Sequence, residues 1–344
     1  MLPESLSANL IIFTLAAVVI FFIGTRLTRL CDELADHTGL GEAFMGAIFL
    51  GAVTSLPGIT ASVTAASSAS AALALSNAYG GIAAQTLFVA IADVFYPRAN
   101  LEHAAASVEN MLSGVSLVVL LGMLVYAHGT PELAIFGVHP VSYLLPLAYV
   151  FFMTLLRRCR QAPMWRARYT RETAFDEPDP ANETLSSAAV ARRWASLAVA
   201  AVVIILAGWY LTRSGQRIAA QTGLSESALG ALLVAVFTSL PELVIAVSAV
   251  RQGALTLAVG GVLGGNVFDT LFAAVADYAY RDGSIYAAAT ERETGMVGLA
   301  LVMSSLILLG LIHRERRGVG GIGFESAGVM VAYVVGVVCL FVTG

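Results

Sequence analysis

Two acidic side chains, Glu242 and Asp269, stand in stretches that are otherwise almost wholly apolar. Thr-Ser-Leu-Pro at 238–241 precedes the first acid, and Gly-Gly-Asn-Val-Phe at 264–268 precedes the second. A carboxylate at membrane depth costs roughly 2.5–3.5 kcal/mol, and two close together need a cation or a proton between them. Carboxylate, hydroxyl and carbonyl oxygens suit a hard cation such as Ca²⁺, which takes roughly 6–8 oxygen ligands. No His or Cys lies in either motif, so zinc and copper are not expected.

The segment that carries these acids has a copy earlier in the chain. Residues 54–94 and 238–278 align without a gap and agree at 16 of 41 positions, which indicates a duplication. Both copies contain Thr-Ser-Leu-Pro, and both contain a Gly-Gly pair, at Gly80-Gly81 and Gly264-Gly265. A duplicated pair of interrupted apolar segments is the best sequence indication of a transporter's binding site.

The prolines of the two copies explain why main-chain oxygens join the predicted site. Pro57 and Pro241 fall in mid-span, where proline removes one helical hydrogen bond and frees carbonyls near positions 53–55 and 237–239. Backbone opened in this way is tolerated at membrane depth only where it lines a cavity or a site. The hydroxyls beside the freed carbonyls are those of Thr54, Ser55, Thr238 and Ser239.

The glycine pairs predict a loosened next helix and a close approach between helices. In the alternative interpretation, the hydroxyls donate to carbonyls of their own helix and the glycines serve only helix packing. The recurrence of the whole set at the same offsets favours the site. Asp93 and Asp277 also match across the copies and are expected at helix ends or in a vestibule rather than among the ligands.

The elements that must position these residues are membrane-spanning helices. Hydrophobic residues make up 58% of the 344-residue chain and charged residues 12%, far from the soluble balance. A spanning helix needs about 20 apolar residues. Ten windows meet this requirement and predict an all-α integral membrane protein: 9–29, 43–66, 70–94, 108–127, 134–156, 194–212, 228–250, 254–278, 294–313 and 322–343.

Ten spans divide into two halves of five, so the second copy enters the membrane inverted with respect to the first. The first half covers 1–156, with its repeat motif at 46–94, and the second covers 194–344, with its motif at 230–278. An Arg-rich, Pro-broken linker, 157–193, joins them. All 19 basic residues are Arg, and placing both termini outside puts 15 of them on the cytoplasmic side, as the positive-inside rule requires. The first span lacks a signal-peptide pattern and is expected to be retained.

The duplicated motifs resemble those of the calcium/cation antiporters, which include the sodium/calcium exchangers. Their repeats carry G-T-S-x-P-E and then, at the spacing that separates Glu242 from Asp269 here, an Asn or Asp after a G-S-N-type break. The segments 238–242 and 264–269 are similar to these two motifs. The resemblance implies a ten-helix fold of two inverted repeats and a midplane ion site. It also implies metal ligands from Glu242, Asp269, Thr54, Ser55, Thr238, Ser239, Gln85, Gly81 and Gly265, the two glycines through their carbonyls.

The first copy departs from the family pattern. Gly58 stands where the family has glutamate, and Gln85 stands where it has Asn or Asp. Two carboxylates balance one Ca²⁺, two Na⁺ or two H⁺, so we expect exchange that moves no net charge.

The expected function is secondary antiport of a divalent cation, Ca²⁺ first, against Na⁺. Two alternatives stay open: a H⁺-coupled Ca²⁺/cation antiporter, and a non-transporting or channel-like homologue in which the missing acid has abolished coupling. No nucleophile–base pair or cofactor loop is visible, so neither an enzyme nor a bound cofactor is expected. The expected partners are inorganic cations and membrane lipids, not nucleic acid. The protein is expected to act as a monomer in a prokaryotic inner membrane.

Overall fold

The computed structural model describes residues 4–38, 55–96, 98–161, 187–253, 255–318 and 322–342, and in these ranges the chain contains helices and no strand. Only helices and closed barrels satisfy all backbone polar groups within a bilayer, which explains why so apolar a chain folds in this way. The helices of the first half are α1 (Leu6–Thr38), α4 (Leu56–Ala66), α5 (Ala71–Val94), α6 (Leu101–Ala104), α7 (Val108–Gly129) and α8 (Pro140–Gln161).

The described residues of the second half are also helical. Its elements are α9 (Ser187–Thr222), α10 (Glu226–Ala228), the π-helix η3 (Leu229–Val234), α11 (Ala235–Thr238), α12 (Leu240–Gln252), α13 (Leu255–Asp269), α14 (Leu271–Ala279), α15 (Glu291–His313) and α16 (Phe324–Val342).

Seven of these helices are long and apolar enough to cross a membrane, and a bent pair, 226–238 with 240–251, makes an eighth. The apolar helices Leu56–Ala66 and Phe324–Leu340 are shorter, and much of the predicted second span lies outside the described residues. The first and sixth predicted spans are shorter than the observed helices, since α1 continues to Thr38 and α9 begins at Ser187. Hydropathy detects only the apolar part of a helix, and these extensions carry Arg and other polar residues.

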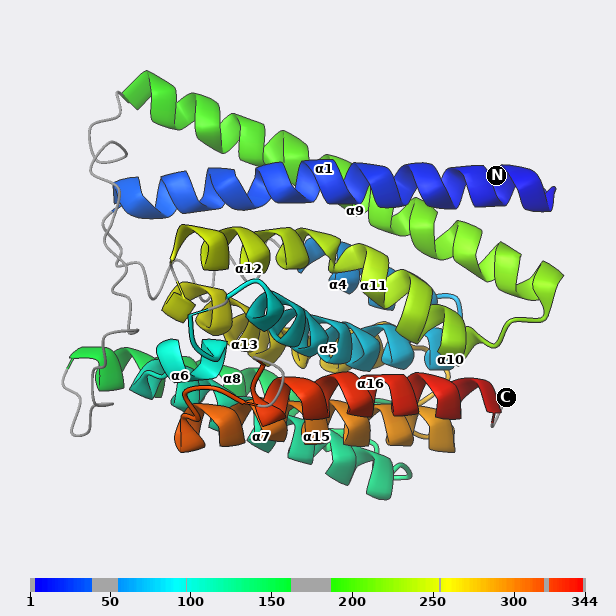
Figure 1. The fold of residues 1–344 in the computed structure, drawn as a ribbon. Coiled ribbons are helices and arrows are strands. Elements are labelled where there is room, and N and C mark those ends of the chain that lie inside the picture. Colours follow the sequence, from blue (N-terminus) through cyan, green and yellow to red (C-terminus); the bar gives the residue numbers. More distant parts are fainter. Residues whose placement is uncertain are drawn as a thin grey trace.

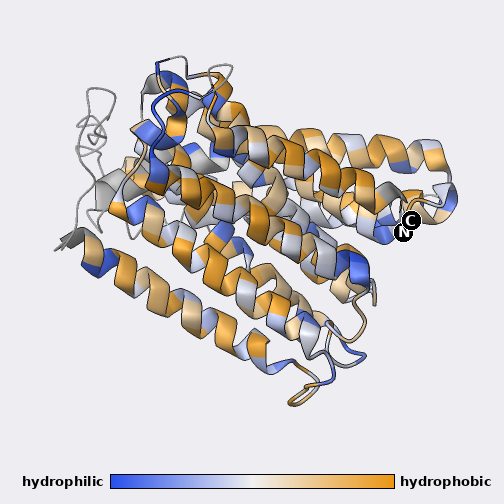
Figure 2. Cartoon of the chain, turned by 60° about the horizontal axis from the view of Figure 1, so that its bottom comes forward, coloured by the Kyte–Doolittle hydropathy of each residue, from blue (hydrophilic) through white to orange (hydrophobic). Residues whose placement is uncertain are grey.

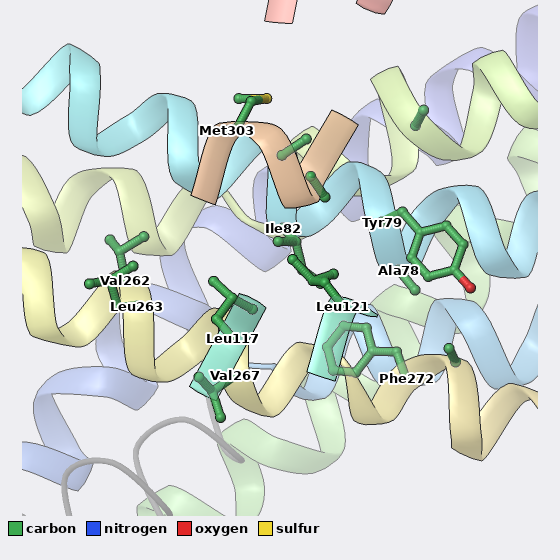
Figure 3. Packing of buried hydrophobic residues seen from close by; sticks show 14 of the residues in the cluster. Ala78, Tyr79, Ile82, Leu117, Leu121, Val262, Leu263, Val267, Phe272 and Met303 are labelled. Carbon is green, nitrogen blue, oxygen red and sulfur yellow. The ribbon is translucent and has the colours of Figure 1, made fainter. Parts of the chain in front are cut away.

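Helix α5 forms the centre of the bundle. Of its 24 residues, 20 are buried, and α4, α12, α13, α15, α16 and η3 all pack against it. In Figure 3, Ile82 of α5 lies near Leu117 and Leu121 of α7 and Val267 of α13, all within the apolar core. The polar groups of the duplicated segments are therefore enclosed by apolar packing.

Helices α5 and η3 approach each other without intervening side chains. A Cβ atom added to Gly80 would lie 2.6 Å from the Cα of Ala231, and one added to Gly230 would lie 2.7 Å from the carbonyl oxygen of Leu73. Close approach through small residues is typical of helix packing in membranes. The predicted close approach at the first glycine pair is therefore present.

Helices α1 and α9 run side by side across one face of the bundle (Figure 1). Their outer surfaces expose large apolar side chains, among them Ile11, Phe22 and Val199. Figure 2 shows that hydrophobic residues continue along the outer helices, while hydrophilic residues concentrate toward the helix ends and loops. The chain is an integral membrane protein, and its two ends lie at the same end of the bundle (Figure 1).

Candidate cation site

A helix begins directly after the serine of each Thr-Ser-Leu-Pro motif. Helix α4 begins immediately after Ser55, and α12 begins immediately after Ser239, where the chain bends by 48°. Pro57 and Pro241 lie in the first turns of these helices, where a missing N–H has no helical partner to lose. Pro241 thus lies just after a helix break at Ser239, and Pro57 stands in the first turn of α4, directly after Ser55.

Asp269 is the centre of the cluster. The Ser55 hydroxyl donates to its Oδ1 at 2.6 Å, and the Gln85 amide nitrogen donates to its Oδ2 at 2.6 Å. The same amide nitrogen lies 3.3 Å from the Ser239 hydroxyl oxygen. All four residues are buried; Ser55 and Gln85 belong to the first copy, and the other two belong to the second. The duplicated motifs therefore meet, and bonds between the two halves hold them together.

Glu242 lies in the first turn of α12, beside this cluster. Its side chain is half-buried as a whole, but its Oε2 is inaccessible and has no hydrogen-bond partner. The Asp269 carboxylate is close enough to repel it electrostatically. The Oε1 of Gln85 is also buried without a partner. A desolvated oxygen without a donor is costly, and a bound cation would remove that cost. These oxygens are of the kind that a hard cation prefers.

Gly81 and Gly265 flank the cluster, although not in the way expected. A Cβ atom at Gly81 would lie 3.8 Å from the Ser239 hydroxyl oxygen, and one at Gly265 would lie 3.4 Å from Gln85 Oε1. However, α5 and α13 run unbroken through both glycine pairs, so the prediction of loosened helices there is wrong. Close packing accounts for Gly80 alone, since a Cβ atom at Gly264 would meet nothing within 4 Å. The interruption in the second copy comes after Asp269, at Thr270.

The threonines of the motifs contribute less than the serines. The Thr238 hydroxyl donates back to carbonyls of its own helix, those of Val234 at 2.9 Å and Ala235 at 3.1 Å. Its equivalent, Thr54, lies outside the described residues. Pro241 has no N–H, so the carbonyl of Phe237 lacks its usual helical donor and is available near the break.

Gly58 shows why the first copy has no acid. The ring of Phe272 fills the space that a side chain at Gly58 would enter, since an added Cβ would overlap the ring. Phe272 is 3% exposed and belongs to the apolar core. The Phe272 ring therefore excludes any side chain at position 58 unless the packing there changes.

We predict that Gly58→Ala lowers the stability of the purified protein by about 1–3 kcal/mol, the usual cost of overpacking. In a Phe272→Leu background the same substitution should cost less than half as much, because the smaller side chain leaves room. Thermal unfolding in detergent measures both differences, and Gly261→Ala, where an added Cβ meets nothing within 4 Å, is the matched control. An equal cost in both backgrounds would contradict the proposed overlap.

Sequence reasoning missed Tyr149 and Asn77. The hydroxyl of Tyr149, on α8, is buried without a hydrogen-bond partner. It interacts electrostatically with the Asp269 carboxylate. The Asn77 amide donates to the Gly58 carbonyl at 3.0 Å and to the Ser62 hydroxyl at 2.8 Å, which fixes α4 against α5. A buried Asn in an apolar span is visible in sequence, whereas nothing distinguishes Tyr149 from any interfacial tyrosine.

Asp93 and Asp277 are not in the cluster. Each lies in the last turns of its helix and accepts from a backbone N–H in the loop that follows, that of Leu101 at 2.6 Å and that of Ile285 at 2.7 Å. Both are structural residues at helix ends.

A helical membrane bundle that gathers carboxylate, amide and hydroxyl oxygens at broken helices defines a class of protein: cation transporters. Residues 8–157 and 193–342 match the family model described as sodium/calcium exchanger protein. The chain belongs to the sodium/calcium exchanger protein family. Proteins of this family exchange ions across membranes, are not enzymes and use no bound cofactor, as the sequence predicts.

Individual relatives agree with this assignment. The chain is 27% identical over 179 residues to the inner membrane protein YrbG of Escherichia coli, a match that covers 52% of this chain and 53% of that protein. It is 25% identical over 310 residues to the putative antiporter CaxA of Alkalimonas amylolytica, covering 89% of this chain and 92% of that one. A shorter match, 39% identical over 72 residues, covers 21% of the sodium/calcium exchanger MaX1 of Methanosarcina acetivorans and 21% of this chain.

Solved structures share the fold. The sodium-calcium exchanger NCX_Mj superposes with a TM-score of 0.60 at 16% identity, covering 97% of this chain and 99% of that one. The H⁺/Ca²⁺ exchanger CAX superposes with a TM-score of 0.71 at 14% identity, covering 96% and 82%. The prediction of a calcium/cation antiporter is therefore confirmed at the level of the family.

Proposed function

We propose that this protein is a secondary antiporter that exchanges a divalent cation, Ca²⁺ first, for Na⁺ at the Asp269 cluster. The observation that carries the proposal is the pair of buried, unpartnered oxygens, Glu242 Oε2 and Gln85 Oε1, beside a carboxylate bonded from both halves. Oxygen ligands of this mixed kind suit hard cations. In this proposal the site comprises the nine residues expected from the sequence, with Thr238 contributing through its carbonyl.

We propose further that the chain has ten spans, arranged as two inverted five-helix halves, 1–156 and 194–344, joined by a cytoplasmic linker, 157–193. Equivalent contacts support this arrangement. A Cβ added to Gly24 of α1 would lie 2.6 Å from the side chain of Pro241. Gly208 of α9 stands at the position equivalent to Gly24, and a Cβ added there would lie 3.1 Å from the carbonyl oxygen of Pro57. Each half thus places its first helix on the helix break of the other half.

The same proposal fixes the orientation in the membrane. The termini face outside, and the Arg-rich linker lies on the cytoplasmic side near lipid headgroups. The distribution of Arg between the two sides supports this choice, because cytoplasmic loops carry an excess of basic residues.

The two glycine contacts identify the helices that move in the proposed mechanism. Helices α1 and α9 hold none of the proposed ligands, pack on each other and touch the breaks through glycine. Glycine has no side chain that could interlock with the neighbouring segment, so α1 and α9 can slide along it. We propose that Ca²⁺ and Na⁺ compete for Glu242 and Asp269, and that α1 and α9 slide across the loaded site to expose it to the other side. The bundle works as a monomer in this scheme.

Counterflow in proteoliposomes tests the function. Vesicles that contain the purified protein should take up Ca²⁺ when an outward Na⁺ gradient is imposed, and not when K⁺ or H⁺ gradients replace it. Vesicles without protein are the control. Ca²⁺ flux that needs no counter-ion would contradict antiport and favour a channel-like homologue.

A proton-coupled antiporter is the second candidate, and the charge of the site favours it over a channel-like homologue. The carboxylates of Glu242 and Asp269 would bind two protons as readily as two Na⁺, because either pair of ions neutralises both groups. It predicts Ca²⁺ uptake driven by a pH gradient in sodium-free buffer, which the same vesicles measure.

A further inference from the structure

The two helix-end aspartates make equivalent contacts in the two halves of the molecule. Each contact, here called a joint, links the end of the aspartate's own helix to the start of another helix. Asp93 accepts from the backbone N–H of Gly323 at 3.1 Å, just before α16 begins. Asp277 accepts from the backbone N–H of His139 at 2.8 Å, just before α8 begins. The offset in sequence from His139 to Gly323 is the same as the offset from Asp93 to Asp277. Each aspartate therefore fastens the last helix of the other half.

The two joints differ at two equivalent positions. The first contains Glu102 and Glu325, and at the same offset the second contains Tyr286 and Val141. In the second joint the Ser142 hydroxyl donates to Asp277 at 2.7 Å, and Tyr286 is buried in the core. At these two positions the first joint has a pair of glutamates, and the second has a tyrosine and a valine.

Glu102 and Glu325 are completely buried, with relative exposures of 0%. The Ser326 hydroxyl donates to Glu102 Oε1 at 3.3 Å, but Glu102 Oε2 and both carboxylate oxygens of Glu325 have no donor. Gly310 and Gly323 close around Glu325, since a Cβ at Gly310 would lie 2.5 Å from its Cγ. The pocket therefore fits this side chain tightly and keeps it out of contact with water in this conformation.

Ser326, which donates to Glu102, directly follows Glu325 in α16, so the two buried carboxyl groups are near neighbours. A hydrogen bond between carboxyl groups requires a proton on one of them, and two buried like charges cannot both ionise cheaply. Burial, followed by the charges of Asp93 and Glu325, raises the pKa of Glu102 well above its usual value. The geometry and the electrostatics agree on a protonated pair.

The surrounding charged groups do not reverse this conclusion. Asp93 of α5 and Glu315, after α15, act on the pair and are both acidic. Arg314 directs one guanidinium nitrogen to the His103 carbonyl at 3.1 Å, and the His103 ring lies 2.7 Å from the Arg314 carbonyl oxygen.

We propose that Glu102 and Glu325 form a proton-binding site, separate from the cation cluster, whose shared proton fastens α16 to α6. When the proton leaves, the two carboxylates repel, and the joint that ties α16 to the end of α5 loosens. Gln85 of the cation cluster and Asp93 of this joint both belong to α5. A movement of α5 at the joint would therefore also move Gln85. In the orientation proposed above, the site responds to cytoplasmic pH.

Infrared spectroscopy tests the bound proton directly. In a Glu242→Gln/Asp269→Asn background, which removes the carboxyl signal of the cation cluster, a protonated-carboxyl band should persist at neutral pH. Glu102→Gln or Glu325→Gln should remove that band, whereas Glu109→Gln, an acid at the start of α7, should leave it. A band that survives both substitutions would overturn the proposal.

Thermal unfolding in detergent provides a second measurement. Because the pKa of Glu102 is raised on folding, its contribution to stability is complete below the ordinary glutamate value, about 4.3, and is lost as pH rises toward the folded value. In the same background, the melting temperature should fall by several degrees from acid to mildly alkaline pH, and Glu102→Gln should flatten that slope. Superimposable slopes, or stabilisation by added Ca²⁺ that needs Glu102, would refute a proton site. Neither readout depends on transport.

Discussion

Glu242→Gln and Asp269→Asn should each reduce Na⁺-driven Ca²⁺ uptake to the level of protein-free vesicles. Removing one partner of a desolvated charge interaction costs about 3–5 kcal/mol, and each 1.4 kcal/mol is about tenfold in affinity. Both variants should remain folded, because an amide has the shape of the carboxylate it replaces. The measurement is uptake of radioactive calcium into proteoliposomes with a fixed outward Na⁺ gradient.

Glu291→Gln is the matched control, since it removes one acid from an exposed position in the first turn of α15. Its uptake should equal that of the wild type. Wild-type uptake by either Glu242→Gln or Asp269→Asn would remove the basis of the proposed site.

Gln85→Glu should make transport respond to membrane potential. The wild-type site has two carboxylates in its described part, and these balance Ca²⁺ against two Na⁺ without net charge. A third carboxylate at position 85, where the amide nitrogen now lies 2.6 Å from Asp269, would admit a third Na⁺ and move one charge per cycle. That charge is worth about 2.3 kcal/mol per 100 mV, so an inside-negative or inside-positive potential should change Ca²⁺ uptake severalfold.

Potentials set with K⁺ and valinomycin provide the measurement, and Gln85→Asn, which keeps the amide, is the control. The wild type and Gln85→Asn should be insensitive to the potential. Voltage-dependent uptake by the wild type would contradict the two-carboxylate balance, and insensitivity of an active Gln85→Glu variant would place residue 85 outside the charge-balancing set.

The sequence was sufficient for the parts of the site that depend on local chemistry. Proline after Thr-Ser in an apolar run predicts a helix break, which is present at Ser239, and a helix also begins directly after Ser55. The acids Glu242 and Asp269 are conspicuous because their burial is costly, and a duplication predicts that the copies meet. The observed bonds from Ser55 and Gln85 to Asp269 agree with that expectation.

Other features depend on tertiary packing and could not be predicted in this way. Glycine pairs suggest either flexibility or close contact, and only the neighbouring backbone of Ala231 decides for contact at Gly80. The space at Gly58 is filled from Phe272, in the other half of the chain, so no local pattern indicates it. Tyr149 likewise becomes relevant only because α8 packs beside α14.

The main-chain contact between α5 and η3 has a consequence for how such a protein can diverge. Where Gly80 meets Ala231 and Gly230 meets Leu73, no methyl group can be added without moving backbone, so this contact keeps α5 and η3 at a fixed separation. Side chains around the contact between α5 and η3 can be substituted while the two helices keep their positions. An ancestral acid can therefore be exchanged for glycine or glutamine, and a new ion preference can arise, without a new fold.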